Sequence, residues 1–489
     1  MKKIVIYSAF TLLAFLSSCS DFLDVNSDPN NPTEVDPSLV LPSAEAQIAG
    51  VLNGYYGVLG GIWSQHWTQS HVASQYRSED SYGLTKSSYN VAWRELYSDA
   101  LIDLSVIRKS AEEAGNWNAY LQATSLMAYT YQILADFYDQ VPFSEALKGN
   151  EGINEPVFDS GQDVYDGLID MLDEALAKDF TADGNTWIQT DFVFGALGKD
   201  GQIDSWIRFA NTLKLKIYLR QTEARSSVAQ DGISKILNSD NLLTGDAAMD
   251  IFEDVANRSY PLYETNVRQL NVATNLRGSH TFISYLLENN DPRIDAFFNP
   301  GNNGHFGLRQ GDFDALSTDI DPAAPDVAVF SPTTAFYFFT TEEVNFMLAE
   351  ANLRYGNSGD VIGYYNSGVM QSCARHGVNG DGLVSDGGAY AYPDGTLDQN
   401  LKAIMMQKWV SMVERGYESF MDQNRTGIPN ISSVPADDPN YVPGEYTYSI
   451  AGVTNGVFPR RLIFPDLTRR NNSNTPVEQP ITERVWWAK

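Results

Sequence analysis

Five aromatic residues of the sequence have the chemistry of sugar contacts, because they lie in polar, loop-like stretches: Tyr76, Tyr82, Trp187, Tyr390 and Tyr392. An aromatic ring offers a flat apolar face to the C–H face of a sugar. Neighbouring Asn, Asp, Gln and Arg side chains can hydrogen-bond the sugar hydroxyls. These five are therefore candidate carbohydrate-contact residues, although a single loop aromatic more often packs within its own protein. Three other tryptophans fall in helical patterns and are expected in the core: Trp93, Trp206 and Trp409.

Acidic loops raise a second chemistry, the binding of calcium through hard oxygen ligands. Asp312, Asp314, Asp319 and Asp321 share one loop, and Asp381 and Asp386 share another. Neither spacing is that of an EF-hand, and a solvated acidic loop is the commoner interpretation. A structural calcium therefore stays open here as a candidate cofactor, and no other cofactor is predicted.

Signatures of catalysis are missing from the sequence. His66 and His71 are five residues apart, off the i, i+4 spacing of a helical zinc pair, and no HExxH, phosphate-binding G-x-x-x-x-G-K-[ST] or G-x-S-x-G motif occurs. A glycosidase needs only two carboxylates at a set separation. Since the chain has 62 acidic residues, candidate pairs occur everywhere and do not discriminate. We predict neither a metal site nor an enzyme, and keep a surface glycoside hydrolase as the less favoured alternative.

Composition excludes further classes. The 489 residues are 43% hydrophobic and 12% aromatic, enough for a large core rather than a disordered chain. The formal net charge of −29 repels phosphate backbones, which argues against a nucleic-acid partner.

The N-terminus has the features of an export signal. Lys2 and Lys3 precede the uncharged apolar run Ile4–Leu16, which is shorter than the roughly 20 residues of a membrane-spanning helix. Leu16-Ser17-Ser18-Cys19 resembles the lipobox of bacterial lipoproteins, in which the cysteine is acylated. We predict a signal peptide over 1–18, lipidation of Cys19 and a tether over 19–43; an ordinary signal peptide cleaved nearby is the alternative.

Two details follow from this assignment. If Cys19 carries lipid, Cys373 has no disulfide partner and is expected to be a small buried side chain. Asp21 and Asp24 resemble the surface-export signal of certain Gram-negative lipoproteins, although two aspartates can also occur by chance in so acidic a chain. The expected location is the outer membrane, on its extracellular side.

Helical periodicity dominates the rest of the chain. Val344, Met347, Leu348, Ala351 and Tyr355 share one helix face, and Thr340 with Glu343 fits a capping box. Further helices are expected at 44–66, 87–114, 117–139, 163–175, 202–224, 228–238, 279–289, 359–376 and 401–412, several of them as antiparallel pairs. Long irregular segments are expected at 181–201, 240–278, 290–339, 377–396 and 426–480. We predict a mostly α fold in one domain, 44–489, with tetratricopeptide-like helix pairs and a loop-rich second face that binds the ligand.

A series of short motifs, in order along the chain, resembles the SusD/RagB-type outer-membrane nutrient-binding lipoproteins of the second SusD-like subgroup. The series includes Ala135-Asp136-Phe137-Tyr138, Trp206-Ile207-Arg208-Phe209-Ala210-Asn211, Asn290-Asp291-Pro292-Arg293, Gly416-Tyr417-Glu418-Ser419-Phe420 and Pro459-Arg460-Arg461-Leu462-Ile463-Phe464-Pro465. Departures are small: Asp139-Gln140 stands where the family usually has Gly-Asp, and Phe420 and Asn424 replace a Trp and an Arg.

This resemblance implies a helical scaffold at the cell surface that captures a ligand. It implies a SusC-like TonB-dependent transporter as partner, for which the protein acts as lid. The ligand of such proteins is usually an oligosaccharide and sometimes a peptide. Binding residues vary within the family, so none is carried over by motif.

Overall fold

The computed structural model describes residues 36–239, 241–272, 274–314, 326–356 and 359–489. The predicted signal peptide, Cys19, most of the predicted tether, Asp319 and Asp321 lie outside these residues. Within them, no helix is both long enough and apolar enough to cross a membrane.

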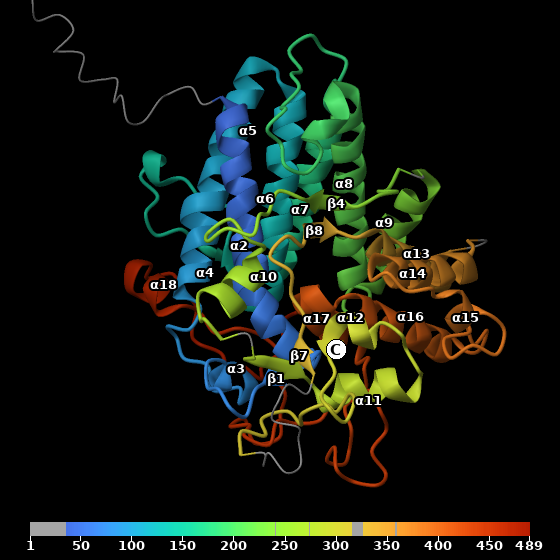
Figure 1. Ribbon diagram of the computed structural model, residues 1–489. Coiled ribbons are helices and arrows are strands. Elements are labelled where there is room, and N and C mark those ends of the chain that lie inside the picture. The colour runs from blue at the N-terminus through green and yellow to red at the C-terminus, as the bar shows by residue number, and fades with distance from the viewer. Residues whose placement is uncertain (1–35, 240, 273, 315–325, 357–358) are drawn as a thin grey trace, which may run out of the picture.

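Helices make up most of the structure, and the longer ones stand side by side in the upper part of Figure 1. Their bounds are α2 (Pro37–Trp63), α3 (Arg77–Asp80), α4 (Asn90–Arg94), α5 (Ile102–Ala114), α6 (Trp117–Tyr138), α7 (Gly161–Leu176), α8 (Gly198–Arg220), α9 (Ser226–Ser239), α10 (Pro261–Tyr263), α11 (His280–Glu288), α12 (Ile294–Phe297), α13 (Thr341–Tyr355), α14 (Val361–Arg375), α15 (Asp381–Val384), α16 (Leu397–Ser411), α17 (Gly416–Thr426) and α18 (Asp466–Asn471).

Neighbouring helices pack as pairs: α5 with α6, α6 with α7, α8 with α9, and α13 with α14. A π-helical turn, Glu95–Leu101, joins α4 to α5 into one run. This arrangement confirms the mostly α, helix-pair prediction.

Helix α2 begins earlier than the sequence suggested. The predicted start was Ala44, but the helix starts at Pro37, so residues 37–43 are helical rather than an extended tether. Asp36 caps it by accepting a hydrogen bond from the backbone N–H of Ser38, and proline is favoured in the first helical turn because its missing N–H would be unpaired there.

Short strands occur between the predicted helices, most of them in segments expected to be irregular. A four-stranded antiparallel sheet has the order β1 (Trp67–Gln69), β5 (Leu276–Gly278), β7 (Val327–Ala328), β6 (Phe298–Asn299). Two smaller sheets pair β2 (Val141–Pro142) with β3 (Phe158–Asp159), and β4 (Ala247–Met249) with β8 (Phe336–Phe339). Strands this short carry almost no alternation that a sequence could display.

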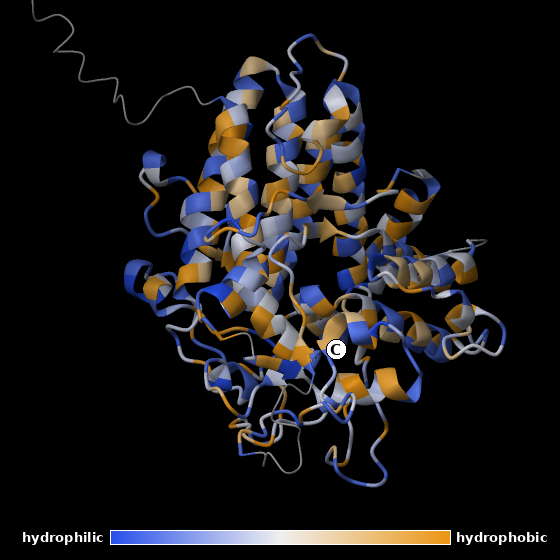
Figure 2. Cartoon of the chain, viewed as in Figure 1, coloured by the Kyte–Doolittle hydropathy of each residue, from blue (hydrophilic) through white to orange (hydrophobic). Residues whose placement is uncertain are grey.

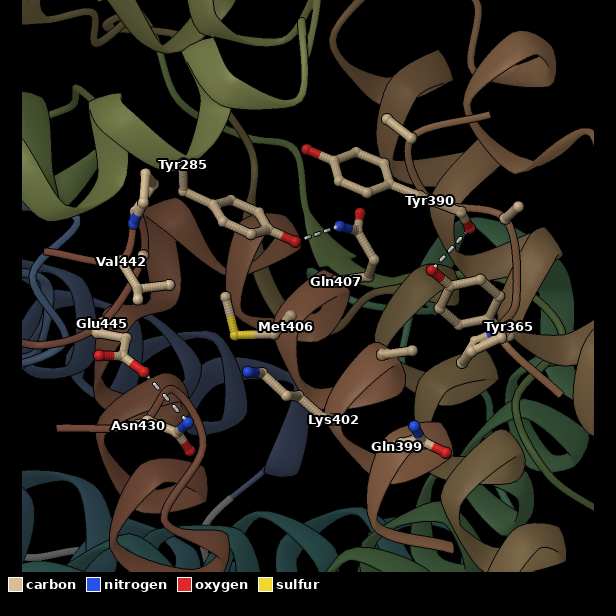
Figure 3. Close-up of a pocket in the computed structure, with 16 residues that line it drawn as sticks. Tyr285, Tyr365, Tyr390, Gln399, Lys402, Met406, Gln407, Asn430, Val442 and Glu445 are labelled. Atoms are coloured by element: carbon tan, nitrogen blue, oxygen red, sulfur yellow. Dashed lines mark hydrogen bonds between the residues drawn. The ribbon is translucent and has the colours of Figure 1, made fainter. Parts of the chain in front are cut away.

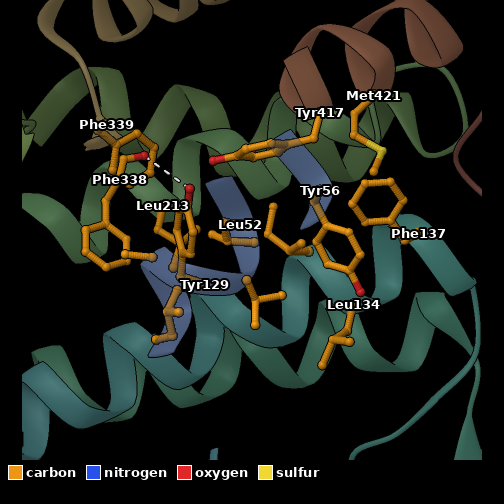
Figure 4. Close-up of a cluster of buried hydrophobic side chains, with 14 of the residues drawn as sticks. Leu52, Tyr56, Tyr129, Leu134, Phe137, Leu213, Phe338, Phe339, Tyr417 and Met421 are labelled. Carbon is orange, nitrogen blue, oxygen red and sulfur yellow. Dashed lines mark hydrogen bonds between the residues drawn. The ribbon is translucent and has the colours of Figure 1, made fainter. Parts of the chain in front are cut away.

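Buried hydrophobic side chains of the described residues form two clusters, and the larger one includes residues from Leu41 to Trp487. Figure 4 shows its centre, where Tyr56 of α2 and Phe137 of α6 pack in a tilted ring pair with centroids 4.5 Å apart. The Tyr129 hydroxyl donates to the carbonyl of Phe338, 3.2 Å away. Figure 2 shows hydrophobic and hydrophilic residues interspersed along the long helices, as amphipathic helices around a shared core require. Cys373 is fully buried, as predicted.

A buried ionic cluster lies inside this core. Lys216 of α8 contacts Glu343 of α13 and Glu418 of α17, each at 2.8 Å. Its other members are Arg220, Asp136, Asp422, Lys408, Arg415, Arg425 and Glu350. The five cations and five carboxylates balance, which lets the charges be buried at tolerable cost.

The cluster changes one expectation. Thr340 caps α13 by accepting from the Glu343 N–H, but the Glu343 carboxylate pairs with Arg415 at 2.6 Å, so the capping box is half made.

Glycines let α2 and α17 touch closely. A Cβ on Gly60 would lie 2.1 Å from the backbone N of Tyr417, and one on Gly416 would lie 2.5 Å from Cα of Gly61. No larger residue fits this crossing without moving backbone.

Candidate ligand-binding site

A cavity of about 290 Å³ opens between α11, α16 and two loops in the lower right of Figure 1. We call it the tyrosine pocket. Its lining is Tyr285, Tyr365, Ala389, Tyr390, Ala391, Pro393, Gln399, Lys402, Ala403, Met406, Gln407, Asn430, Val442, Pro443, Gly444 and Glu445.

Helix α16 supplies one wall of the tyrosine pocket. Gln399, Lys402, Ala403, Met406 and Gln407 lie at i, i+3, i+4, i+7 and i+8, and so share one face of the helix. The helix is fixed at its start by a complete capping box, in which Thr396 and Gln399 cap each other's backbone N–H groups.

Two tyrosines from distant segments stack at the pocket. The rings of Tyr285 (α11) and Tyr390 lie nearly parallel, 14° between planes, with centroids 6.1 Å apart. Gln407 Nε2 donates to the Tyr285 hydroxyl at 3.2 Å, as Figure 3 shows. Tyr390 donates its hydroxyl to Asp291 at 2.8 Å. Both rings are therefore held in place before any ligand arrives.

A buried ion pair anchors this arrangement. Arg293 contacts Asp291 at 2.6 Å and also donates to the Oε1 atom of Gln407 at 3.0 Å. Burial raises the pKa of Asp291, but the hydrogen bonds and the charge of Arg293, with the Tyr390 hydrogen bond, together outweigh it, so the pKa of this carboxyl lies below its usual value. Burial raises the pKa of both Tyr285 and Tyr390, so both are neutral phenols at neutral pH. Asp291 and Arg293 thus pair within one of the motifs that carry the family resemblance.

The two loops fit closely over the tyrosines. Tyr365 donates to the carbonyl of Tyr390 at 2.9 Å and fixes the backbone there. Gly444 has φ of +88°, and a Cβ on it would lie 2.7 Å from Cδ2 of Tyr285. Glycine is required at this position by both its backbone angle and the space available.

Polar groups surround the rings. Lys402 makes no ion pair among the described residues, and Asn430 donates to Glu445 at 3.3 Å. Glu445 is the one carboxylate among the sixteen lining side chains of Figure 3. Stacked rings beside amides, an ammonium and a carboxylate suit a polyhydroxylated ligand with a flat apolar face.

The five predicted aromatics do not share one site. Tyr390 lines the tyrosine pocket, and Tyr392 lies next to it with its ring 5.2 Å from that of Tyr365. Trp187 is 42% exposed in the connection between α7 and α8, and its Nε1 donates to the carbonyl of Gly195.

Tyr76 and Tyr82 are core residues beside α3, only 7% and 3% exposed. Tyr82 packs edge-on against Tyr448, with centroids 5.5 Å apart. Their polar sequence neighbours suggested exposure, but both rings are buried and neither lines the tyrosine pocket. Residues of the C-terminal loops, Tyr448 and Phe458, pack against Tyr82.

Several pocket residues were missed by sequence reasoning. Tyr285 was assigned to a helix and so to the core, while Lys402 and Gln407 belong to a helix read only for its apolar face. The available signal was Gln399, Lys402 and Gln407, three polar residues that share one face of α16.

The calcium hypothesis gains no support from the described residues. They contain no group of three or more His, Cys, Asp or Glu side chains placed to hold a metal ion. Asp312 instead pairs with Arg309 at 2.6 Å. Asp319 and Asp321 lie outside the described residues.

The fold is a helical scaffold with a candidate ligand pocket, and comparison places the chain in a family. Residues 29–465 match the model of SusD-like proteins, described as starch-binding and associating with the outer membrane. The chain therefore belongs to the SusD-like family, as its motifs suggested.

Solved structures have the same fold. A SusD homologue from Bacteroides uniformis matches with a TM-score of 0.76 and 20% identity, over 93% of this chain and 100% of that one. A chitin-binding protein matches with a TM-score of 0.73 and 21% identity, over 93% and 100%. A chitin-binding SusD homologue from Flavobacterium johnsoniae matches with a TM-score of 0.71 and 19% identity, over 91% and 98%. The comparison with curated proteins gave no match.

Proposed function

We propose that this protein is a cell-surface lipoprotein that binds an oligosaccharide in the tyrosine pocket and passes it to a SusC-like TonB-dependent transporter, for which it acts as lid. The observation that carries the binding proposal is the parallel Tyr285–Tyr390 pair, held by the buried Asp291–Arg293 ion pair. Membership of a family described as starch-binding supports a glycan as the ligand.

Binding is tested by calorimetry with the purified protein and neutral oligosaccharides of starch, chitin and plant cell walls. Tyr285→Ala removes the more exposed of the two rings, and we expect a loss of affinity of at least about fivefold, since stacking of this kind is worth about 1 kcal/mol or more. Trp187→Ala is the matched aromatic control in a distant loop. If Trp187→Ala loses binding and Tyr285→Ala keeps it, the binding site is in the loop of Trp187 and not in the tyrosine pocket.

A peptide is the alternative ligand, and short peptides belong in the same screen. Binding of peptides without any saccharide would replace the glycan proposal. A surface glycoside hydrolase is less favoured, because the tyrosine pocket offers Glu445 alone where such enzymes use two carboxylates. Release of reducing sugar by the purified protein would reverse that preference.

The lipid anchor and the partner need a separate test. In cell fractionation, Cys19→Ser is expected to release the protein from the outer membrane, with Cys373→Ser as the control that keeps it there. A TonB-dependent transporter is expected to copurify with the anchored protein. Retention of Cys19→Ser in the membrane would overturn the anchor.

A further inference from the structure

A second cavity, of about 590 Å³, adjoins the tyrosine pocket. We call it the cationic pocket. It is lined by Gln423, Asn424, Gly427, Asn430, Ile431, Ser433, Glu445, Arg460, Arg484 and Lys489. Asn430 and Glu445 belong to both linings, so one extended ligand can reach from one pocket into the other.

Three basic side chains converge on this cavity: Arg460, Arg484 and Lys489. In the part of the chain that the structure describes, none of the three forms an ion pair, although the protein carries a net charge of −29. Burial and the nearby charge of Arg484 lower the pKa of Arg460. The two guanidinium groups therefore repel each other here and form no ion pair among the described residues, so a bound anion would relieve this repulsion.

Neutral acceptors hold Arg460 in the cavity. Nη1 of Arg460 donates to Oδ1 of Asn424 at 2.6 Å and to Oε1 of Gln423 at 3.5 Å. Asn424 and Gln423 are 1% and 5% exposed at the end of α17. Amide partners orient the guanidinium without neutralising it, so its charge stays available. Glu445 is the single carboxylate side chain of the lining, and Asn430 donates to it.

We propose that the cationic pocket takes the carboxylate or sulfate group of an acidic oligosaccharide whose uncharged rings lie in the tyrosine pocket. This inference rests on the proposed glycan function and narrows the substrate class to anionic glycans. Arg460 and Arg484 hold the anionic group by charge-assisted hydrogen bonds, whose donor geometry suits carboxylate and sulfate alike. Glu445 faces the uncharged part, where its oxygens accept from sugar hydroxyls.

The test is an affinity panel on the full protein, with tetrasaccharides matched in length: neutral galactan, galacturonate and a sulfated galactan. The wild type is expected to bind one acidic form at least about tenfold more tightly than the neutral one, and added salt should reduce this difference in affinity. Arg484→Gln, at an exposed position, is expected to remove most of that preference, so that the acidic and neutral forms bind with similar affinity. Lys235→Gln is the matched control, an exposed cation on α9 without an ion pair among the described residues.

The outcomes separate the two proposals. Equal binding of acidic and neutral forms, or a preference that survives both Arg460→Gln and Arg484→Gln, overturns the cationic pocket and leaves the glycan function standing. A preference lost equally in Lys235→Gln also overturns it, because the effect is then one of net charge. Absence of binding to any saccharide, including a result in which only acidic peptides bind, overturns both.

Discussion

Replacing Lys216 by methionine tests the buried ionic cluster directly. The side chain is 3% exposed, and Nζ contacts two carboxylates that are themselves almost fully buried. Arg415 still holds Glu343 and Arg220 still holds Glu418 in the variant. Five carboxylates would then face four cations, which leaves one buried negative charge uncompensated.

The expected cost in free energy of unfolding is about 3–5 kcal/mol, the range for breaking a buried pair from one side. Lys214→Met is the control, two residues along the same helix. Lys214 pairs with Asp173, which is 54% exposed, so the expected cost there is at most about 1 kcal/mol.

Urea unfolding at pH 7.5 measures both variants, with Lys216→Met/Glu418→Gln as a third that restores charge balance. This double variant is expected to recover about half or more of the lost stability. In the wild type, Lys216 and the nearby arginines lower the pKa of Glu418 against the effect of burial. Without Lys216 the pKa of Glu418 rises, so the stability lost in Lys216→Met relative to the wild type should become smaller as the pH falls. A cost no larger than that of Lys214→Met, or no recovery in the double variant, would refute the reasoning.

Three further predictions concern single positions. Burial raises the pKa of Asp80 to about 6, so its contribution to stability is present below its unfolded pKa and lost as pH rises through about 6. The free energy of unfolding of Asp80→Asn, measured relative to the wild type in urea titrations, should therefore rise by about 2–3 kcal/mol between pH 4 and pH 8. A difference that does not change with pH would contradict this. Gly60→Ala should lower the free energy of unfolding by about 3 kcal/mol or more, because the new Cβ would collide with the Tyr417 backbone. Gly50 lies on the same helix, and a Cβ there has nothing within 4 Å, so Gly50→Ala should be neutral or stabilising. Thermal melts measure both variants. Gly444→Ala should weaken saccharide binding in calorimetry, because its Cβ would displace the Tyr285 ring. Unchanged affinity would show that this loop is not part of the binding site.

The sequence predicted the helical scaffold well, because apolar spacing such as that of Val344, Met347 and Ala351 is a local property. Trp206 and Trp409 were expected in the core, and they are 0% and 2% exposed. Strands of two to four residues could not be foreseen, since their partners lie far along the chain.

The site was harder to predict for the same reason. Tyr285, Tyr390 and Glu445 come from three separate segments, and only tertiary packing brings them together. A polar sequence neighbourhood also failed as a guide to exposure, since Tyr390 and Tyr82 are only 4% and 3% exposed. Tyr390 lines the tyrosine pocket and Tyr82 does not, and their sequence contexts do not show this difference.

The glycine crossing of α2 and α17 has a consequence for the order of folding. Pairs such as α5 with α6 are close in sequence and can form early, whereas α2 docks on α17 only after almost the whole chain is available. Next to this crossing, Gln65 donates to the carbonyl of Thr447, 382 positions away. Closing so long a loop is entropically costly, and we expect this docking to be a late, rate-limiting step. Until it occurs, the apolar face of α2 lacks its cover, so the slowest-folding part of the protein is also the part most exposed to aggregation.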